Sequence, residues 1–188
     1  MRYLGLAGVG CILLYAWSAH AQEPRVNPQA AILQAFQERI QEYMKLREAA
    51  AKGAPKQKNT DDAEAIRAAQ DALASRIREA RRSAKPGAIF TPEIARHLRG
   101  LLHPAVEGRR GAETKAAIED VQPSAVPLKV NARYPDNQPR PLMPPNVLAR
   151  LPRLPDALEY RIVKGHLILR DAEANLIVDY IPNAVPRR

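Results

Sequence analysis

Apolar and β-branched residues alternate in three short runs near the C-terminus, which predicts three β-strands. The runs cover residues 158–163, 166–169 and 176–181. Gly165 follows Lys164 between the first two runs and tolerates the positive φ of a tight hairpin. Residues 171–175 are rich in turn formers, and Pro182 ends the third run because it lacks an N–H donor. The pattern predicts an antiparallel meander whose apolar face needs a cover from earlier in the chain.

Apolar residues near the N-terminus recur at steps of three and four, which predicts a helix over residues 28–51. Asn27 suits the N-cap and Pro28 the first helical position. Gly53 and Pro55 end the pattern. The stripe consists of Ile32, Leu33, Phe36, Ile40, Tyr43 and Met44.

A second helical stripe follows a basic, turn-rich link over residues 52–60. Asp61 suits the N-cap, and Glu64 three residues later completes the spacing of a capping box. Pro86 and Gly87 end this helix. The stripe consists of Ile66, Ala69, Leu73, Ile77 and Ala80. Two helices joined by a short link pack most simply as an antiparallel hairpin.

Two shorter helices are predicted next. The first of them begins with Thr91 as N-cap and Pro92 at the first helical position, and Pro104 ends it. Its apolar edge consists of Ile94, Leu98, Leu101 and Leu102. The second covers residues 113–121.

The composition changes at residue 122. Nine of the 17 prolines lie within residues 122–157, together with regularly spaced leucines that a free linker would lack. This segment is therefore expected to be an ordered strap that joins the helices to the sheet. The sequence predicts an α+β protein in four parts. These are a signal peptide (1–21), a helical region (22–121), the strap (122–157) and the meander (158–188).

The first residues have the pattern of a secretory signal. Arg2 is followed by an apolar run over residues 3–17, and Ala19 and Ala21 fit the small-x-small cleavage rule. Cleavage after Ala21 would leave a periplasmic or secreted chain with no transmembrane segment. It would also leave no cysteine, because Cys11 lies inside the apolar run. Disulfides, thiol catalysis and thiolate zinc sites are thereby excluded from the mature chain.

The charge is strongly basic, with 29 Lys and Arg against 20 Asp and Glu and a formal net charge of +9 at pH 7. In an exported protein this favours an acidic envelope protein or an anionic envelope surface as partner; plain solubility is the alternative. Nucleic acid is not expected, because neither Phe36 nor Phe90 lies among the arginines. A lone helical hairpin buries little apolar area, so homodimerisation through the long helices is a further expectation.

Arginines near the helix ends form the candidate site for an anion or a partner. The set is Arg78, Arg81, Arg82, Arg96, Arg99, Arg109 and Arg110. Arginine binds phosphate and carboxylate well, so these residues would form a patch if they share a face. Solvated helix faces are the alternative interpretation. Gly108 and Gly111 flank the last pair, which indicates a basic turn.

No metal site, cofactor or catalytic centre is expected. His97 and His103 are six residues apart, whereas a metal-binding pair on a helix needs three or four. The serines Ser75, Ser83 and Ser124 lie in no G-x-S-x-G motif, and no Gly-rich phosphate loop is present. The acidic residues are expected to cap the second helix (Asp61, Asp62, Glu64) or to lie in the second turn and on the solvent face of the meander (Asp171, Glu173, Asp179).

Two resemblances extend this interpretation. Residues 89–102, 130–139 and 151–184 read IFTPEIARHLRGLL, VNARYPDNQP and LPRLPDALEYRIVKGHLILRDAEANLIVDYIPNA. With FQERIQEYMKLR in the first helix, they resemble an uncharacterised family of exported bacterial proteins, which implies an envelope protein. The spacing of LP, KGHLIL and NLIVDYI is similar to the small sheet that ends nickel/cobalt-homeostasis periplasmic proteins of the RcnB type. That similarity carries over no metal ligand.

Two functions follow as hypotheses. The first is a non-enzymatic envelope protein that binds a partner through its helices or its basic face. The alternative is a periplasmic metal-response protein of the RcnB-like type.

Overall fold

The structure, a computed structural model, describes residues 27–54, 62–120, 122–123 and 125–186, and the side chain of Arg110 is outside this description. The predicted signal peptide, its cleavage site and the predicted N-cap Asp61 lie outside the described residues. The helices are α1 (Pro28–Lys52), α2 (Ala63–Ala80), α3 (Pro92–Leu102), the 3-10 turn η1 (His103–Ala105), α4 (Gly108–Asp120) and α5 (Pro145–Leu148). The strands are β1 (Leu158–Val163), β2 (His166–Asp171) and β3 (Leu176–Ile181). The predicted α+β class is confirmed.

The three strands form an antiparallel sheet in the order β1-β2-β3, as the alternation predicts. Lys164 (φ 49°) and Gly165 (φ 77°) make the two-residue turn between β1 and β2. β2 continues two residues beyond the predicted run, because Arg170 and Asp171 also pair with β3. Asn175, with φ 52°, precedes β3 in the second turn.

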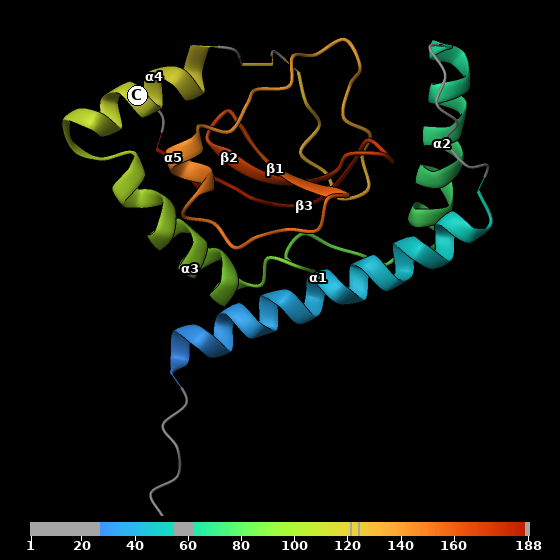
Figure 1. Ribbon diagram of the computed structural model, residues 1–188, viewed down its shortest axis with the longest axis horizontal. Coiled ribbons are helices and arrows are strands. Elements are labelled where there is room, and N and C mark those ends of the chain that lie inside the picture. The colour runs from blue at the N-terminus through green and yellow to red at the C-terminus, as the bar shows by residue number, and fades with distance from the viewer. Residues whose placement is uncertain (1–26, 55–61, 121, 124, 187–188) are drawn as a thin grey trace, which may run out of the picture.

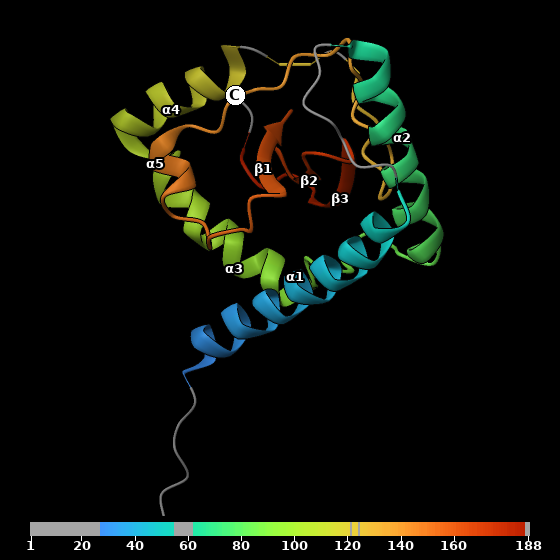
Figure 2. The same cartoon turned by 45° about the vertical axis from the view of Figure 1, so that its right-hand side comes forward.

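Helices surround the sheet. In Figure 1, α1 runs below it, α2 stands at one end, and α3 and α4 lie at the other; Figure 2 shows the same arrangement from a second angle. Helices α1 and α2 pack together, and Arg76 of α2 donates from Nε to the carbonyl oxygen of Ala50 near the end of α1 at 3.0 Å. No helix within the described ranges is long and apolar enough to cross a membrane.

The two faces of the sheet have different covers. The main core joins α1, α2 and α3 to one face, and within it the rings of Phe36 and Phe90 stack with centroids 6.0 Å apart. A smaller core on the other face brings Tyr134 of the strap against Ile168 and Ile177. Over its described residues the strap therefore contributes to both cores, because Tyr134 covers this face while Val147 and Leu151 belong to the main core.

Helix starts follow the predicted chemistry with two corrections. Asp62, not Asp61, caps α2, and its side chain accepts from the backbone N–H of Glu64 at 2.9 Å. Helix α4 begins at Gly108 rather than at residue 113, so Arg109 lies in its first turn and not in a loop. The early start needs glycine at 111, where a Cβ would lie 2.2 Å from the carbonyl carbon of Val106.

Candidate functional site

Arg81 turns inward at the end of α2 and is only 8% exposed. Its Nη1 donates to Oδ1 of Asn131 at 3.0 Å, and its Nη2 donates to the carbonyl oxygen of Val178 at 3.1 Å. The guanidinium also lies 5.1 Å from the ring centroid of Tyr43. Burial lowers the pKa of Arg81 from its ordinary value. Arg81 therefore holds α2, the strap and β3 together and is not presented to an external anion.

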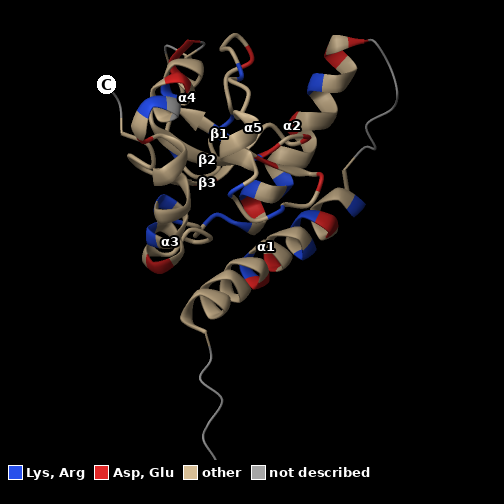
Figure 3. Ribbon diagram, turned by 60° about the vertical axis from the view of Figure 1, so that its left-hand side comes forward, with Lys and Arg blue, Asp and Glu red and all other residues tan. Residues whose placement is uncertain are grey.

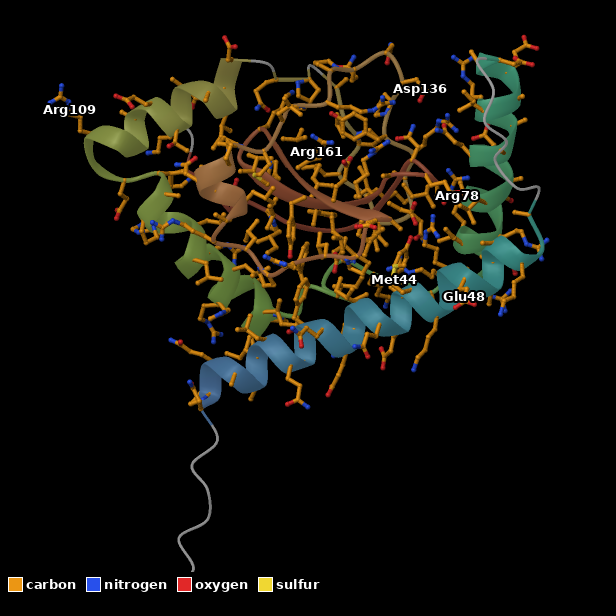
Figure 4. The ribbon with its side chains drawn as sticks, in the orientation of Figure 1. Met44, Glu48, Arg78, Arg109, Asp136 and Arg161 are labelled. Atoms are coloured by element: carbon orange, nitrogen blue, oxygen red, sulfur yellow. The ribbon has the colours of Figure 1, made fainter. Side chains whose placement is uncertain are left out.

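Beside Arg81, residues from the last part of α2, from the turn that follows it and from strap residues 129–132 line a hollow of about 890 Å³, which we call the basic hollow. Arg78, labelled in Figure 4, donates from Nε to the carbonyl oxygen of Asn131 at 3.0 Å. Arg76 is fixed in the same way by Ala50. Each of these two hydrogen bonds to a backbone carbonyl oxygen uses one N–H of the guanidinium group. The cations that line the basic hollow are Arg76, Arg78, Arg82 and Lys129.

Positive charge exceeds negative charge in the basic hollow. Glu79 is the one acidic residue of the lining, and it pairs with Arg82 at 3.4 Å. Both side chains are well exposed, so the pair contributes at most about 1 kcal/mol and is readily exchanged for another anion. The planar guanidinium offers a fork of N–H donors that matches phosphate and carboxylate oxygens. The hollow can therefore bind an anionic group.

The other predicted arginines lie elsewhere. Arg96 is exposed on α3, and Arg99 donates from Nη2 to the carbonyl oxygen of Pro182 at 2.9 Å. Arg109 lies on α4, on the opposite side of the molecule from Arg78 (Figure 4). Figure 3 likewise shows Lys and Arg on α1, α2, α3 and α4 rather than on one element. Of the seven predicted residues, the structure brings Arg78 and Arg82 together in the basic hollow.

Lys129 belongs to the basic hollow although it was not predicted to be a site residue. Its position in the strap, far from α2 in the sequence, gave no signal. Arg76 lies in the basic last part of α2. The sequence does not distinguish it from an arginine on a solvated helix face, because its hydrogen bond to the Ala50 carbonyl oxygen is seen only in the structure.

Two carboxylates predicted at the solvent face are buried, and that prediction is wrong. Asp179 accepts from the backbone N–H groups of Gly87, Ile89 and Phe90 at 2.8 to 3.0 Å. Asp171 is as deeply buried and holds α1. It accepts from the Tyr43 hydroxyl at 2.8 Å, from Arg47 Nε at 2.8 Å and from Ala174 N–H at 2.8 Å. Both carboxylates serve the fold, because they satisfy donors that would otherwise be buried without partners.

The histidines do not converge. His103 pairs through Nδ1 with Glu107 at 3.1 Å, and His166 accepts through Nδ1 from the Asn183 N–H at 3.0 Å. His97 has a buried Nε2 with no partner in the described part of the chain. Within these same residues, no group of three or more His, Cys, Asp or Glu side chains is placed to hold a metal ion. The metal-response hypothesis stays a prediction, and the described residues supply no ligand set for it.

Fold and hollow together define an α+β protein with a cationic surface depression beside a helix. Comparison with known proteins adds no identity: no family model, no curated protein and no solved structure matches the chain. The two resemblances stated from the sequence stay predictions.

Proposed function

We propose that the protein is an exported, non-enzymatic binding module of the bacterial envelope that takes an anionic group into the basic hollow. The observation that carries this proposal is the convergence of Arg76, Arg78, Arg82 and Lys129 around one depression. Four of the ten lining residues are cationic, and the one carboxylate, Glu79, is paired with Arg82. The role that fits this lining is recognition of phosphate or carboxylate.

Fixed geometry supports the same proposal. The backbone carbonyl groups that hold Arg76 and Arg78 set the two guanidinium groups before a ligand arrives. A preorganised site loses less side-chain entropy on binding than a free surface arginine does. Arg81 contributes indirectly, because its bond to Asn131 positions the carbonyl group that holds Arg78.

Flotation with phospholipid vesicles tests the proposal, using protein purified from cells that express the full chain. We expect binding to phosphatidylglycerol vesicles and none to phosphatidylcholine vesicles. Raising the salt from about 0.05 M to about 0.5 M should abolish the binding, because screening weakens contacts between exposed charges.

The matched variants are Lys129→Glu and Lys45→Glu, which change the net charge equally. Lys129 lines the basic hollow, whereas Lys45 is exposed on α1 outside it. We expect Lys129→Glu to lower the affinity for phosphatidylglycerol vesicles about tenfold, which corresponds to about 1.4 kcal/mol of binding free energy. Lys45→Glu should leave that affinity unchanged. Equal losses for both variants, or binding that does not respond to salt, would refute the proposal.

A further inference from the structure

A second surface feature lies between the strap and the sheet edge. Nine strap residues between Leu142 and Leu154, together with residues 158–161 of β1, line an open groove of about 810 Å³. Leu142 is 83% exposed and Leu148 is 48% exposed, and both line this groove. They are the large apolar side chains that stand most exposed within the described residues. Exposed apolar side chains gathered at one hollow indicate an interaction surface, and the volume is typical of a ligand pocket.

The walls of the groove are fixed. The Tyr160 hydroxyl donates to the carbonyl oxygen of Pro152 at 3.2 Å, and Arg161 Nη1 donates to the carbonyl oxygen of Pro141 at 2.9 Å. Val147 of α5 is fully buried and anchors the turn that carries Leu148. The strap therefore holds its exposed leucines in place on a rigid frame, which lowers the entropic cost of docking.

The rim of the groove is positively charged. Arg153 is exposed and has no ion-pair partner in the part of the chain that the structure describes. Glu159, the one acidic residue of the lining, is already paired with Arg161 and Arg170. Arg161 keeps a buried Nε without a hydrogen-bond partner among the described residues. A partner of complementary charge would bring a carboxylate to this apolar surface.

We propose that this groove docks a short segment of an acidic partner protein, in which apolar side chains lie next to a carboxylate. The apolar side chains pack against Leu142 and Leu148, and the carboxylate pairs with Arg153. A second copy of this chain fits less well, because it would bring two positively charged rims together. An acyl chain also fits less well, because an open groove would leave part of the bound chain in water.

Panning a phage-displayed library of random short peptides tests this proposal on protein purified from cells that express the full chain. We expect the enriched peptides to combine leucine-like residues with Asp or Glu. Their affinity should fall about tenfold or more for Leu142→Ser/Leu148→Ser and for Arg153→Glu, since a few anchors carry most of the binding energy. Both leucines are exposed, so these substitutions leave the core intact. The matched control Arg96→Glu makes the same change in net charge as Arg153→Glu, at an exposed position on α3 outside the groove, and should leave peptide binding unchanged.

Several results would overturn the proposal. These are the absence of any enriched peptide, enrichment of basic peptides, and equal affinity for the wild type and the leucine variant. Sedimentation that shows a dimer lost in Leu142→Ser/Leu148→Ser would assign the groove to a second copy instead. Uptake of dodecanoate that the same variant abolishes would assign it to an acyl chain.

Discussion

Arg81 and Asn131 hold each other through two hydrogen bonds: Arg81 Nη1 donates to Asn131 Oδ1 at 3.0 Å, and Asn131 Nδ2 donates to the Arg81 carbonyl oxygen at 2.9 Å. The pair joins the end of α2 to the strap. Asn131 has φ 65°, a conformation that Asn tolerates better than most residues. Its own carbonyl group accepts from Arg78, so the pair also frames the basic hollow.

Replacing Asn131 should therefore weaken both the fold and the hollow. We expect Asn131→Ala to lower the free energy of unfolding by about 2–4 kcal/mol, through the lost hydrogen bonds and the strain of a positive φ. Asn131→Gly should lower the free energy of unfolding by a smaller amount, because glycine adopts a positive φ without strain. Urea unfolding at pH 7 measures both variants. Equal stability of Asn131→Ala and the wild type would contradict the structural role.

Asp179 is the second structural test. Asp179→Ala would leave the N–H groups of Gly87, Ile89 and Phe90 without their acceptor, and we expect a loss of about 3–5 kcal/mol in the free energy of unfolding. Asp156→Ala is the control, since Asp156 is exposed. It should change the free energy of unfolding by less than about 0.5 kcal/mol. A small effect of Asp179→Ala in the same urea titration would show that the loop over residues 86–90 does not depend on this carboxylate.

Two glycines give opposite predictions. Gly111→Ala places a methyl group 2.2 Å from the Val106 carbonyl carbon, so the start of α4 must shift and the melting temperature should fall. Gly100, within α3, has nothing within 4 Å of an added Cβ. Gly100→Ala should raise the stability by about 0.5–1 kcal/mol, because alanine is the better helix former. Thermal unfolding of the two variants should therefore move in opposite directions, and a shared direction would refute the local account.

Glu159 predicts a dependence of stability on pH. Burial alone would raise the pKa of Glu159, but hydrogen bonds and charge from Arg161 and Arg170 outweigh burial and lower it below the ordinary value of 4.5. A lowered folded-state pKa gives stability that is present above about pH 4.5 and is lost as the pH falls through the folded-state value. Glu159→Gln should therefore lower the free energy of unfolding most at pH 7. The difference in unfolding free energy between the variant and the wild type should be smaller at about pH 3.

The control for this pH series is Glu48→Gln. The Glu48–Lys52 pair is 3.1 Å long and highly exposed, so its loss should have little effect at any pH. A difference between Glu159→Gln and the wild type that stays constant across the pH range would contradict the pKa argument.

Sequence patterns predicted the elements better than their connections. Strand alternation around Lys164 and Gly165 fixed the first hairpin, because a two-residue turn with positive φ leaves few alternatives. The N-cap of α2 was placed one residue early, since Asp61 and Asp62 have the same capping chemistry. The start of α4 was missed because the close approach of Gly111 to Val106 has no sequence signal.

The candidate site was less predictable than the fold, for a physical reason. Whether an arginine is free or buried depends on partners distant in the sequence, and Arg81 finds its partner at Asn131. The same limit explains Asp179, whose donors lie around residue 89. A helical wheel places Arg78 and Arg82 on one face, but it does not show that Lys129 of the strap faces them.

The most direct test of the proposed function compares two double charge reversals in the phosphatidylglycerol flotation assay at low salt. Arg78→Glu/Arg82→Glu alters the basic hollow, and Arg96→Glu/Arg109→Glu makes the same change in net charge on α3 and α4. We predict at least about a tenfold loss of vesicle binding for the first variant and less than about a twofold change for the second. Equal losses would show that binding follows net charge alone and would contradict a defined anion site.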